Sequence, residues 1–148
     1  MKIGIANDHR GFDLKEQIVE SLKDKYEFVD VGAYSTDAVD YPDYAFKLGE
    51  MVRDKVVDFG VAICGSGIGI SIACNKVKGI RCAKVSSLDD VIYTRLDNDS
   101  NIVAFSANTK IDDACLYVEK FVETAFSSEE RHQKRIDKIR KYEEENER

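Results

Sequence analysis

The sequence predicts an α/β protein built around a five-stranded, mostly parallel sheet. Short apolar runs alternate with amphipathic segments along the 148 residues, and the chain is long enough to bury the core of one domain. Strands separated by helices pair in parallel when those helices cover both faces of the sheet. We therefore expect a single domain over residues 1–148, folded as a Rossmann-like three-layer α/β/α sandwich with an extended C-terminal helix.

The strands are predicted by five short runs rich in apolar residues. They cover residues 2–6, 27–31, 58–63, 80–85 and 101–105. Ligands of such sheets bind beyond the carboxyl ends of the strands. Three of these ends carry polar or glycine-rich segments, at residues 7–9, 64–69 and 86–87. We expect these segments to meet at one edge of the sheet.

The helices are predicted by apolar residues that recur at intervals of three and four. The segments are residues 14–22, 44–52, 70–76, a helix that starts at Ser87, residues 111–125, and a last helix that starts near Ser127. Ser87 with Asp90 is a variant of the capping box, and Ser127 with Glu130 is predicted to cap the last helix. The only proline, Pro42, falls in the polar segment before the second helix.

Composition excludes several classes of function. The net charge is −6 and the first hundred residues hold no basic cluster, which argues against a nucleic-acid partner. The chain enters a strand pattern at once and has no apolar run of about eighteen residues, so we expect a cytoplasmic protein with no membrane partner. Four cysteines without a CxxC pair and two histidines make a zinc site improbable. Cys74, Cys82 and Cys115 lie within apolar patterns and are expected to be small core residues.

The segment Cys64-Gly65-Ser66-Gly67-Ile68-Gly69 stands where the third strand gives way to a helix. It lacks the last glycine of the dinucleotide fingerprint and the lysine of a Walker loop. What remains is a nest of backbone N–H groups at a helix start, which stabilises negative charge on oxygen and lowers the pKa of a neighbouring thiol. A thiolate base beside an oxyanion site suits proton abstraction next to a carbonyl. A tight turn with an incidental cysteine is the alternative.

Two further groups of residues admit two interpretations each. Arg131 and Arg135 lie one turn apart, with Lys138 close to the same stripe, and could bind a phosphate or form a solvated basic face. His9 follows Asp8 at the end of the first strand, where the pair could serve a binding site or form a turn.

Taken together, the motifs resemble those of the type B ribose-5-phosphate isomerase and galactose-6-phosphate isomerase family. The resemblance covers nearly the whole chain. It rests on Asp8-His9 with Gly11, on residues 39–43 and 63–71, and on Asn75-Lys76, Gly79-Ile80-Arg81, Asn98-Asp99 with Asn101, and Arg131-His132 with Arg135.

The resemblance implies a metal-independent aldose–ketose isomerisation of a sugar phosphate through a cis-enediolate, with no cofactor. By position Cys64 is similar to the family's base, and Ser66 to the residue that moves protons among substrate oxygens. The amides of Gly65, Gly67 and Gly69, with Asn98, resemble its anion hole. Asp8 and Tyr41 match its contacts to sugar hydroxyls, and His9, Arg131 and Arg135 match its phosphate contacts. The family shares each site across a dimer, which implies a homodimer or a dimer of dimers.

Two positions depart from the family pattern. Asp97 stands where the family has the histidine that opens the sugar ring, and Asn108 stands where it has a further phosphate-binding arginine. Aspartate is ionised at neutral pH and donates a proton poorly, whereas imidazole exchanges protons there. The expected substrate pair is ribose 5-phosphate and ribulose 5-phosphate. The alternatives are the same chemistry on another sugar phosphate, such as a six-carbon one, and a paralogue that binds without turnover. Cys64 and Ser66 argue against the last, because binding alone needs no base.

Overall fold

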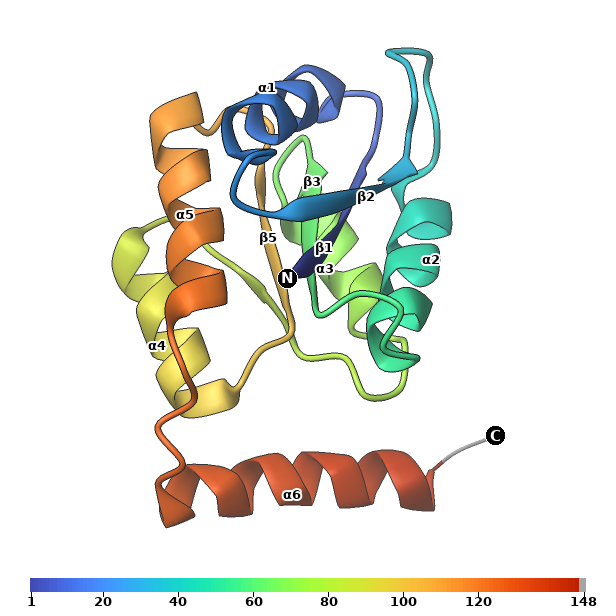
Figure 1. Cartoon of the computed structure of the whole chain (residues 1–148). Coiled ribbons are helices and arrows are strands. Elements are labelled where there is room, and N and C mark those ends of the chain that lie inside the picture. The colour runs from blue at the N-terminus through green and yellow to red at the C-terminus, as the bar shows by residue number, and fades with distance from the viewer. Residues whose placement is uncertain (147–148) are drawn as a thin grey trace.

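The computed structural model describes residues 1–146 and contains the predicted parallel sheet. Its strands are β1 (Lys2–Asn7), β2 (Glu27–Gly32), β3 (Phe59–Cys64), β4 (Cys82–Lys84) and β5 (Ile102–Ser106). They are arranged in the order β2-β1-β3-β5-β4, and each neighbouring pair is parallel. The α/β fold class is confirmed. Because the strands are parallel, the segments after β1, β3 and β5 all emerge at one edge of the sheet (Figure 1).

Helices cover both faces of the sheet and complete the three layers. One face is covered by α1 (Phe12–Leu22), α4 (Leu88–Asn98) and α5 (Ile111–Glu123), and the other by α2 (Tyr41–Arg53) and α3 (Ile68–Cys74). Strand β3 shows how the sequence divides the core, since alternate side chains point to opposite faces. Val61 and Ile63 pack on the first face, while Ala62 and Cys64 pack on the second.

The C-terminal helix α6 (Glu130–Glu145) lies outside these layers. Two of its side chains, His132 and Ile136, are buried, and the helix packs against α4. Figure 1 shows α6 beneath the sheet, at the end of the molecule opposite the turn between β3 and α3. The expected extended C-terminal helix is therefore present, and it leaves the glycine loop at a distance.

Two predicted helix starts have different outcomes. Ser87 caps α4 as expected, because its Oγ accepts a hydrogen bond from the Asp90 amide at 3.1 Å. The predicted cap of the last helix is wrong: the residue before α6 is Glu129, with no side-chain capping bond. Ser127 instead accepts a hydrogen bond from the Glu129 amide at 3.3 Å, which shapes the turn that precedes the helix.

Other boundaries shift for local reasons. Helix α2 begins at Tyr41, so Pro42 lies in its first turn, where the missing N–H of proline costs no hydrogen bond. Strand β4 is shorter than predicted. The amides of Arg81 and Cys82 donate to the side chains of Asn101 and Asn75, which replace strand pairing at that end.

Candidate active site

A pocket of about 520 Å³ opens where the ends of β1 and the start of α2 meet. Asp8, His9 and Tyr41 line it, so three of the predicted site residues share one cavity. The glycine loop after β3 borders this group. A Cβ on Gly69 would lie only 2.6 Å from Cζ of Tyr41, which means that the tyrosine ring packs directly on the loop. The sheet edge therefore gathers the first part of the predicted site.

The backbone of the glycine loop turns sharply at Gly67, which places an N–H group on the thiol of Cys64. Gly67 has φ +79°, the left-handed region that glycine adopts without strain. Its amide donates to Sγ of Cys64 at 3.2 Å, and the cysteine is only 4% exposed. The loop thus fixes the sulfur of Cys64 at the carboxyl edge of the sheet, next to the N–H groups of the turn.

Replacing Gly67 with alanine should destabilise the protein by about 1–2 kcal/mol through its left-handed backbone alone. A further loss is expected because the new Cβ would lie 2.6 Å from the carbonyl carbon of Phe105. Gly79→Ala is the matched control, since Gly79 also has a positive φ but its Cβ would meet only Arg53 Cγ, at 3.9 Å. Urea unfolding of both variants measures the difference. Equal losses would show that the contact with Phe105 relaxes freely.

The remaining cysteines behave as the core residues predicted from the sequence. Cys74 is fully buried. Cys82 packs on the face of the sheet covered by α2 and α3, and Cys115 packs on the face covered by α1, α4 and α5. Contact with Cys74, together with burial, raises the pKa of Cys82, and burial raises the pKa of Cys115. Both effects favour the neutral thiol. Neither of these two side chains is therefore suited to act as a thiolate base.

Hydrogen bonds fix the polar side chains that surround the glycine loop. Asp8 is 6% exposed, and its Oδ1 accepts the Gly11 amide at 3.0 Å. Nδ1 of His9 accepts the Val39 amide at 3.2 Å, so the neutral imidazole carries its proton on Nε2. Ser66 is exposed on the loop, and its Oγ accepts the Ile68 amide at 3.1 Å. These hydrogen bonds define the orientations of the three side chains.

The second part of the predicted site lies elsewhere in the same chain. Helix α4 returns from the carboxyl edge of the sheet to the amino edge, so Asp97 and Asn98 at its end are carried away from Cys64. Arg131 and Arg135 are exposed on the first turns of α6, beneath that amino edge (Figure 1). The predicted residues therefore form two groups at opposite ends of the molecule, and one chain does not bring them together.

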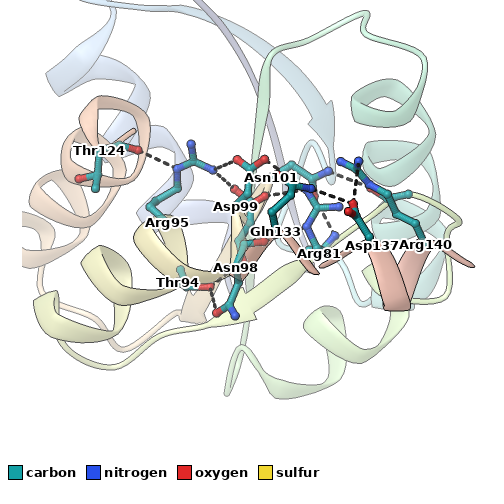
Figure 2. A network of polar contacts seen from close by, with 12 residues as sticks. Arg81, Thr94, Arg95, Asn98, Asp99, Asn101, Thr124, Gln133, Asp137 and Arg140 are labelled. Carbon is teal, nitrogen blue, oxygen red and sulfur yellow. Dashed lines mark hydrogen bonds and ion pairs between the residues drawn. The ribbon is translucent and has the colours of Figure 1, made fainter. Parts of the chain in front are cut away.

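Two arginines hold the end of α4 in place, as Figure 2 shows. Arg95 donates to the carbonyl oxygen of Thr124 at 2.9 Å and to the carboxylate of Asp99 at 2.9 Å. Arg81 donates to the carbonyl oxygen of Asn98 at 2.9 Å, and burial lowers its pKa from the usual range. The turn that presents Asn98 is therefore fixed by charged hydrogen bonds from both sides.

Within this second group, the two side chains at the end of α4 have different partners. Thr94 Oγ1 donates to Oδ1 of Asn98 at 3.2 Å, which orients the amide (Figure 2). Oδ1 of Asp97 lies 3.3 Å from Nε2 of His132 on α6. The sequence had indicated no role for His132 beyond its place in the family motif. This contact joins two helices that are separated by 31 residues of the chain.

Sequence reasoning missed two residues that support the first group. Lys15 is fully buried, and its Nζ contacts Asp30 at 3.1 Å and the carbonyl oxygen of Ala33, which anchors the loop that leads to Val39. Its position within the apolar stripe of α1 was the available signal, because a lysine there must be buried with a partner. Arg10 lies against Gly65, whose Cβ would be 3.0 Å from Cδ of the arginine.

No helix within residues 1–146 is long and apolar enough to cross a membrane. The same residues contain no group of three or more His, Cys, Asp or Glu side chains that could hold a metal ion.

Comparison with known proteins identifies relatives that match the chain over its whole length. The putative sugar phosphate isomerase YwlF of Bacillus subtilis is 42% identical over 148 residues, covering 99% of both chains. Ribose-5-phosphate isomerase B of Escherichia coli is 37% identical over 140 residues, covering 93% of both.

Solved structures show the same agreement in three dimensions. Ribose-5-phosphate isomerase B of Clostridium thermocellum superposes with a TM-score of 0.94 at 40% identity, covering 98% of this chain and 99% of the other. The enzyme of Mycoplasma genitalium, solved with bound ribulose 5-phosphate, gives a TM-score of 0.92 at 39% identity, covering 98% and 97%. The family model described as Ribose/Galactose Isomerase matches residues 3–139. This chain belongs to the ribose/galactose isomerase family of sugar-phosphate isomerases.

Proposed function

We propose that this protein interconverts ribose 5-phosphate and ribulose 5-phosphate through a cis-enediolate, with Cys64 as the base. The observation that carries the proposal is the hydrogen bond from the Gly67 amide to Sγ of Cys64 at 3.2 Å. It fixes the sulfur beside an N–H group at the same sheet edge as the pocket lined by Asp8, His9 and Tyr41. The relatives of E. coli and M. genitalium, whose names specify this reaction and this ligand, point to the same sugar.

The proposed proton path uses Cys64 and Ser66. The Cys64 thiolate removes the proton from C2 of the open-chain aldose, and the electron pair forms the C1–C2 double bond of the enediolate. The same sulfur then returns the proton to C1, while Ser66 moves a proton between the two substrate oxygens. No electrons leave the substrate, so the reaction needs no redox cofactor.

The negative charge of the enediolate requires hydrogen-bond donors that become available as the charge forms. Before the transfer, the Gly67 amide stabilises the thiolate of Cys64. Once Cys64 is a neutral thiol it accepts hydrogen bonds weakly, and this amide becomes available to the enediolate oxygen. Gly65, Gly69 and Asn98 supply the other donors of the anion hole. These N–H groups stabilise the enediolate charge in place of a metal ion. We therefore expect activity to survive treatment with EDTA.

We further propose that two copies of the chain complete each site. Cys64 lies at the carboxyl edge of the sheet, whereas Asn98, Arg131 and Arg135 lie at the opposite end of the same chain (Figure 1). They can meet only if one copy presents α6 and the end of α4 to the glycine loop of the other. Apolar side chains left exposed on α3, Ile68 and Ile72, offer a surface for such a neighbour. A homodimer or a dimer of dimers follows.

Solvent exchange tests the proposed reaction directly. The protein is incubated in D₂O with ribulose 5-phosphate, ribose 5-phosphate and galactose 6-phosphate in separate samples. NMR should show deuterium entering at C1 or C2 of the pentose phosphates, because an enediolate exchanges its proton with solvent. Ribose without its phosphate is the control and should exchange far more slowly. Exchange in none of the sugar phosphates would contradict isomerase chemistry.

A six-carbon sugar phosphate is the second candidate, favoured by the two departures from the family pattern. Asp97 contacts His132, and Asn108 is exposed beyond the end of β5. Both positions lie where the resemblance implies contacts to the sugar ring or the phosphate. Faster deuterium exchange with galactose 6-phosphate than with either pentose phosphate would select this candidate.

A further inference from the structure

Arg10 is a charged residue of the pocket whose side chain has no partner in its own chain. It is exposed and lines the cavity that opens at the end of β1. Within residues 1–146, no hydrogen bond, ion pair or ring contact joins its guanidinium to another residue. Three carboxylates line the same pocket, on Asp8, Asp40 and Asp43, and none of them forms an ion pair with it. The guanidinium is therefore free to bind a ligand.

The side chain of Arg10 lies against the glycine loop. A Cβ on Gly65 would be 3.0 Å from both Cδ and Nη1 of the arginine. Gly65 lacks the positive φ that Gly67 has, so backbone conformation does not require a glycine at position 65. The missing side chain instead leaves room for the arginine to lie along the loop. The guanidinium is thereby held beside the residue that directly follows Cys64.

Arg10 occupies a position where a cation is electrostatically unfavourable. Helix α1 begins at Phe12, and its N-cap is Gly11. The N-terminal end of a helix carries partial positive charge, which disfavours a nearby cation and favours an anion. No carboxylate in the described part of the chain pairs with Arg10 to offset this effect. An anion bound there would be stabilised by both the guanidinium and the helix end. The position therefore fits a ligand-binding role better than a stabilising one.

We propose that Arg10 binds the phosphate group of the substrate and so determines the preference of the pocket for phosphorylated sugars. This inference rests on the proposed function, because it names the group that recognises the phosphate in that same site. Among the described residues that line the pocket, Arg10 is the only one that is always positively charged. Its planar guanidinium offers two parallel N–H donors to a phosphate. The carboxylates of the pocket are acceptors and suit the sugar hydroxyls instead.

Binding can be measured without turnover in a Cys64→Ala background. Isothermal titration gives the Kd of ribulose 5-phosphate and of unphosphorylated ribulose. Adding Arg10→Ala should weaken the binding of ribulose 5-phosphate about ten- to a hundredfold, the effect of losing a hydrogen bond to a charged group. The binding of ribulose should change little.

Two variants make the titration specific. Arg10→Lys keeps the charge but loses the two parallel donors, so it should recover only part of the affinity. Arg53→Ala removes an exposed arginine at the end of α2, outside the pocket, and is the matched control that should bind normally. An equal loss for both sugars in Arg10→Ala, or no loss for either, would overturn the proposal.

Kinetics distinguish a contact with the phosphate from a contact with the enediolate. With Cys64 intact, Arg10→Ala should raise KM for ribulose 5-phosphate and leave kcat nearly unchanged, because the phosphate is bound alike in the ground state and the transition state. A lower kcat with an unchanged KM would place the guanidinium on the enediolate and overturn the proposal. If the protein had no isomerase activity but the titration still depended on Arg10, the proposed function would fail and this inference would stand.

Stability measurements separate this role from a structural one. Arg10→Ala should keep or slightly raise the free energy of unfolding in urea, because a cation is removed from the N-terminal end of α1. Inorganic phosphate should raise the Tm of the wild-type protein and raise that of Arg10→Ala less, since a ligand stabilises the folded state that binds it. Clear destabilisation of the variant, or an equal rise in Tm for both proteins, would contradict a phosphate-binding role for Arg10.

Discussion

Replacing Cys64 with alanine should lower turnover by about 100-fold or more while the affinity for substrate changes little. A general base contributes roughly 10²–10⁴ in rate, and it acts on the proton rather than on the bound sugar. The side chain is 4% exposed, and a cysteine-to-alanine change leaves a small cavity, so the fold should persist. Steady-state kinetics with ribulose 5-phosphate give the turnover, and equilibrium binding of the same sugar to the inactive variant gives the affinity.

Two further variants make this result specific. Cys64→Ser keeps a side chain that can accept the Gly67 amide, but a hydroxyl is a far weaker base at neutral pH, so it should be nearly as inactive. Cys115→Ala removes a partly buried thiol on α5, away from the pocket, and should keep full activity. Near-normal turnover in Cys64→Ala or in Cys64→Ser would show that another group takes the proton.

The residues of the first half of the site could be predicted because they depend on local features of the chain. A glycine loop between a strand and a helix places N–H groups at the strand end whatever the rest of the fold does. The alternation of side chains along β3 then determines the face of the sheet on which Cys64 lies. Parallel pairing brings the segment after β1 to the same edge, so Asp8 and His9 were expected beside the loop. Each step needed only periodicity and the rules of parallel sheets.

The second half depends on contacts that no local pattern contains. The contact between Asp97 and His132 depends on how α6 packs against the end of α4, which periodicity along the sequence does not indicate. The burial of Lys15 could be anticipated from the apolar stripe of α1, but its partners Asp30 and Ala33, in and just after β2, could not. The family resemblance supplied candidate roles for Asn98 and Arg131. The structure adds that these residues lie at the far end of the chain from Cys64.

Replacing Arg131 with alanine should weaken the binding of phosphorylated sugars by about 1.5–3 kcal/mol, the range for hydrogen bonds to charged groups. The side chain is 65% exposed and contacts Glu129 at 2.7 Å, an exposed pair that contributes little to stability. The loss should therefore appear in binding and not in unfolding. Isothermal titration with ribulose 5-phosphate measures it, with unphosphorylated ribulose as the comparison ligand. Arg140→Ala, on the same helix and close to Asp137, should bind normally.

Mixed dimers test whether that arginine serves the neighbouring copy. A dimer of one Cys64→Ala chain and one Arg131→Ala chain has two sites if the proposed sharing holds. One site then lacks both groups, and the other has an intact Cys64 from one chain and an intact Arg131 from its partner. The mixed dimer should recover about half of the wild-type turnover, although each variant alone is impaired at both sites. Purification through two different affinity tags isolates it from the parent dimers. If each site were built within one chain, both sites of the mixed dimer would carry a lesion, and its activity would be the average of the two parents. The measured value therefore separates a site shared between copies from a site contained in one, and the proposed sharing predicts the first result.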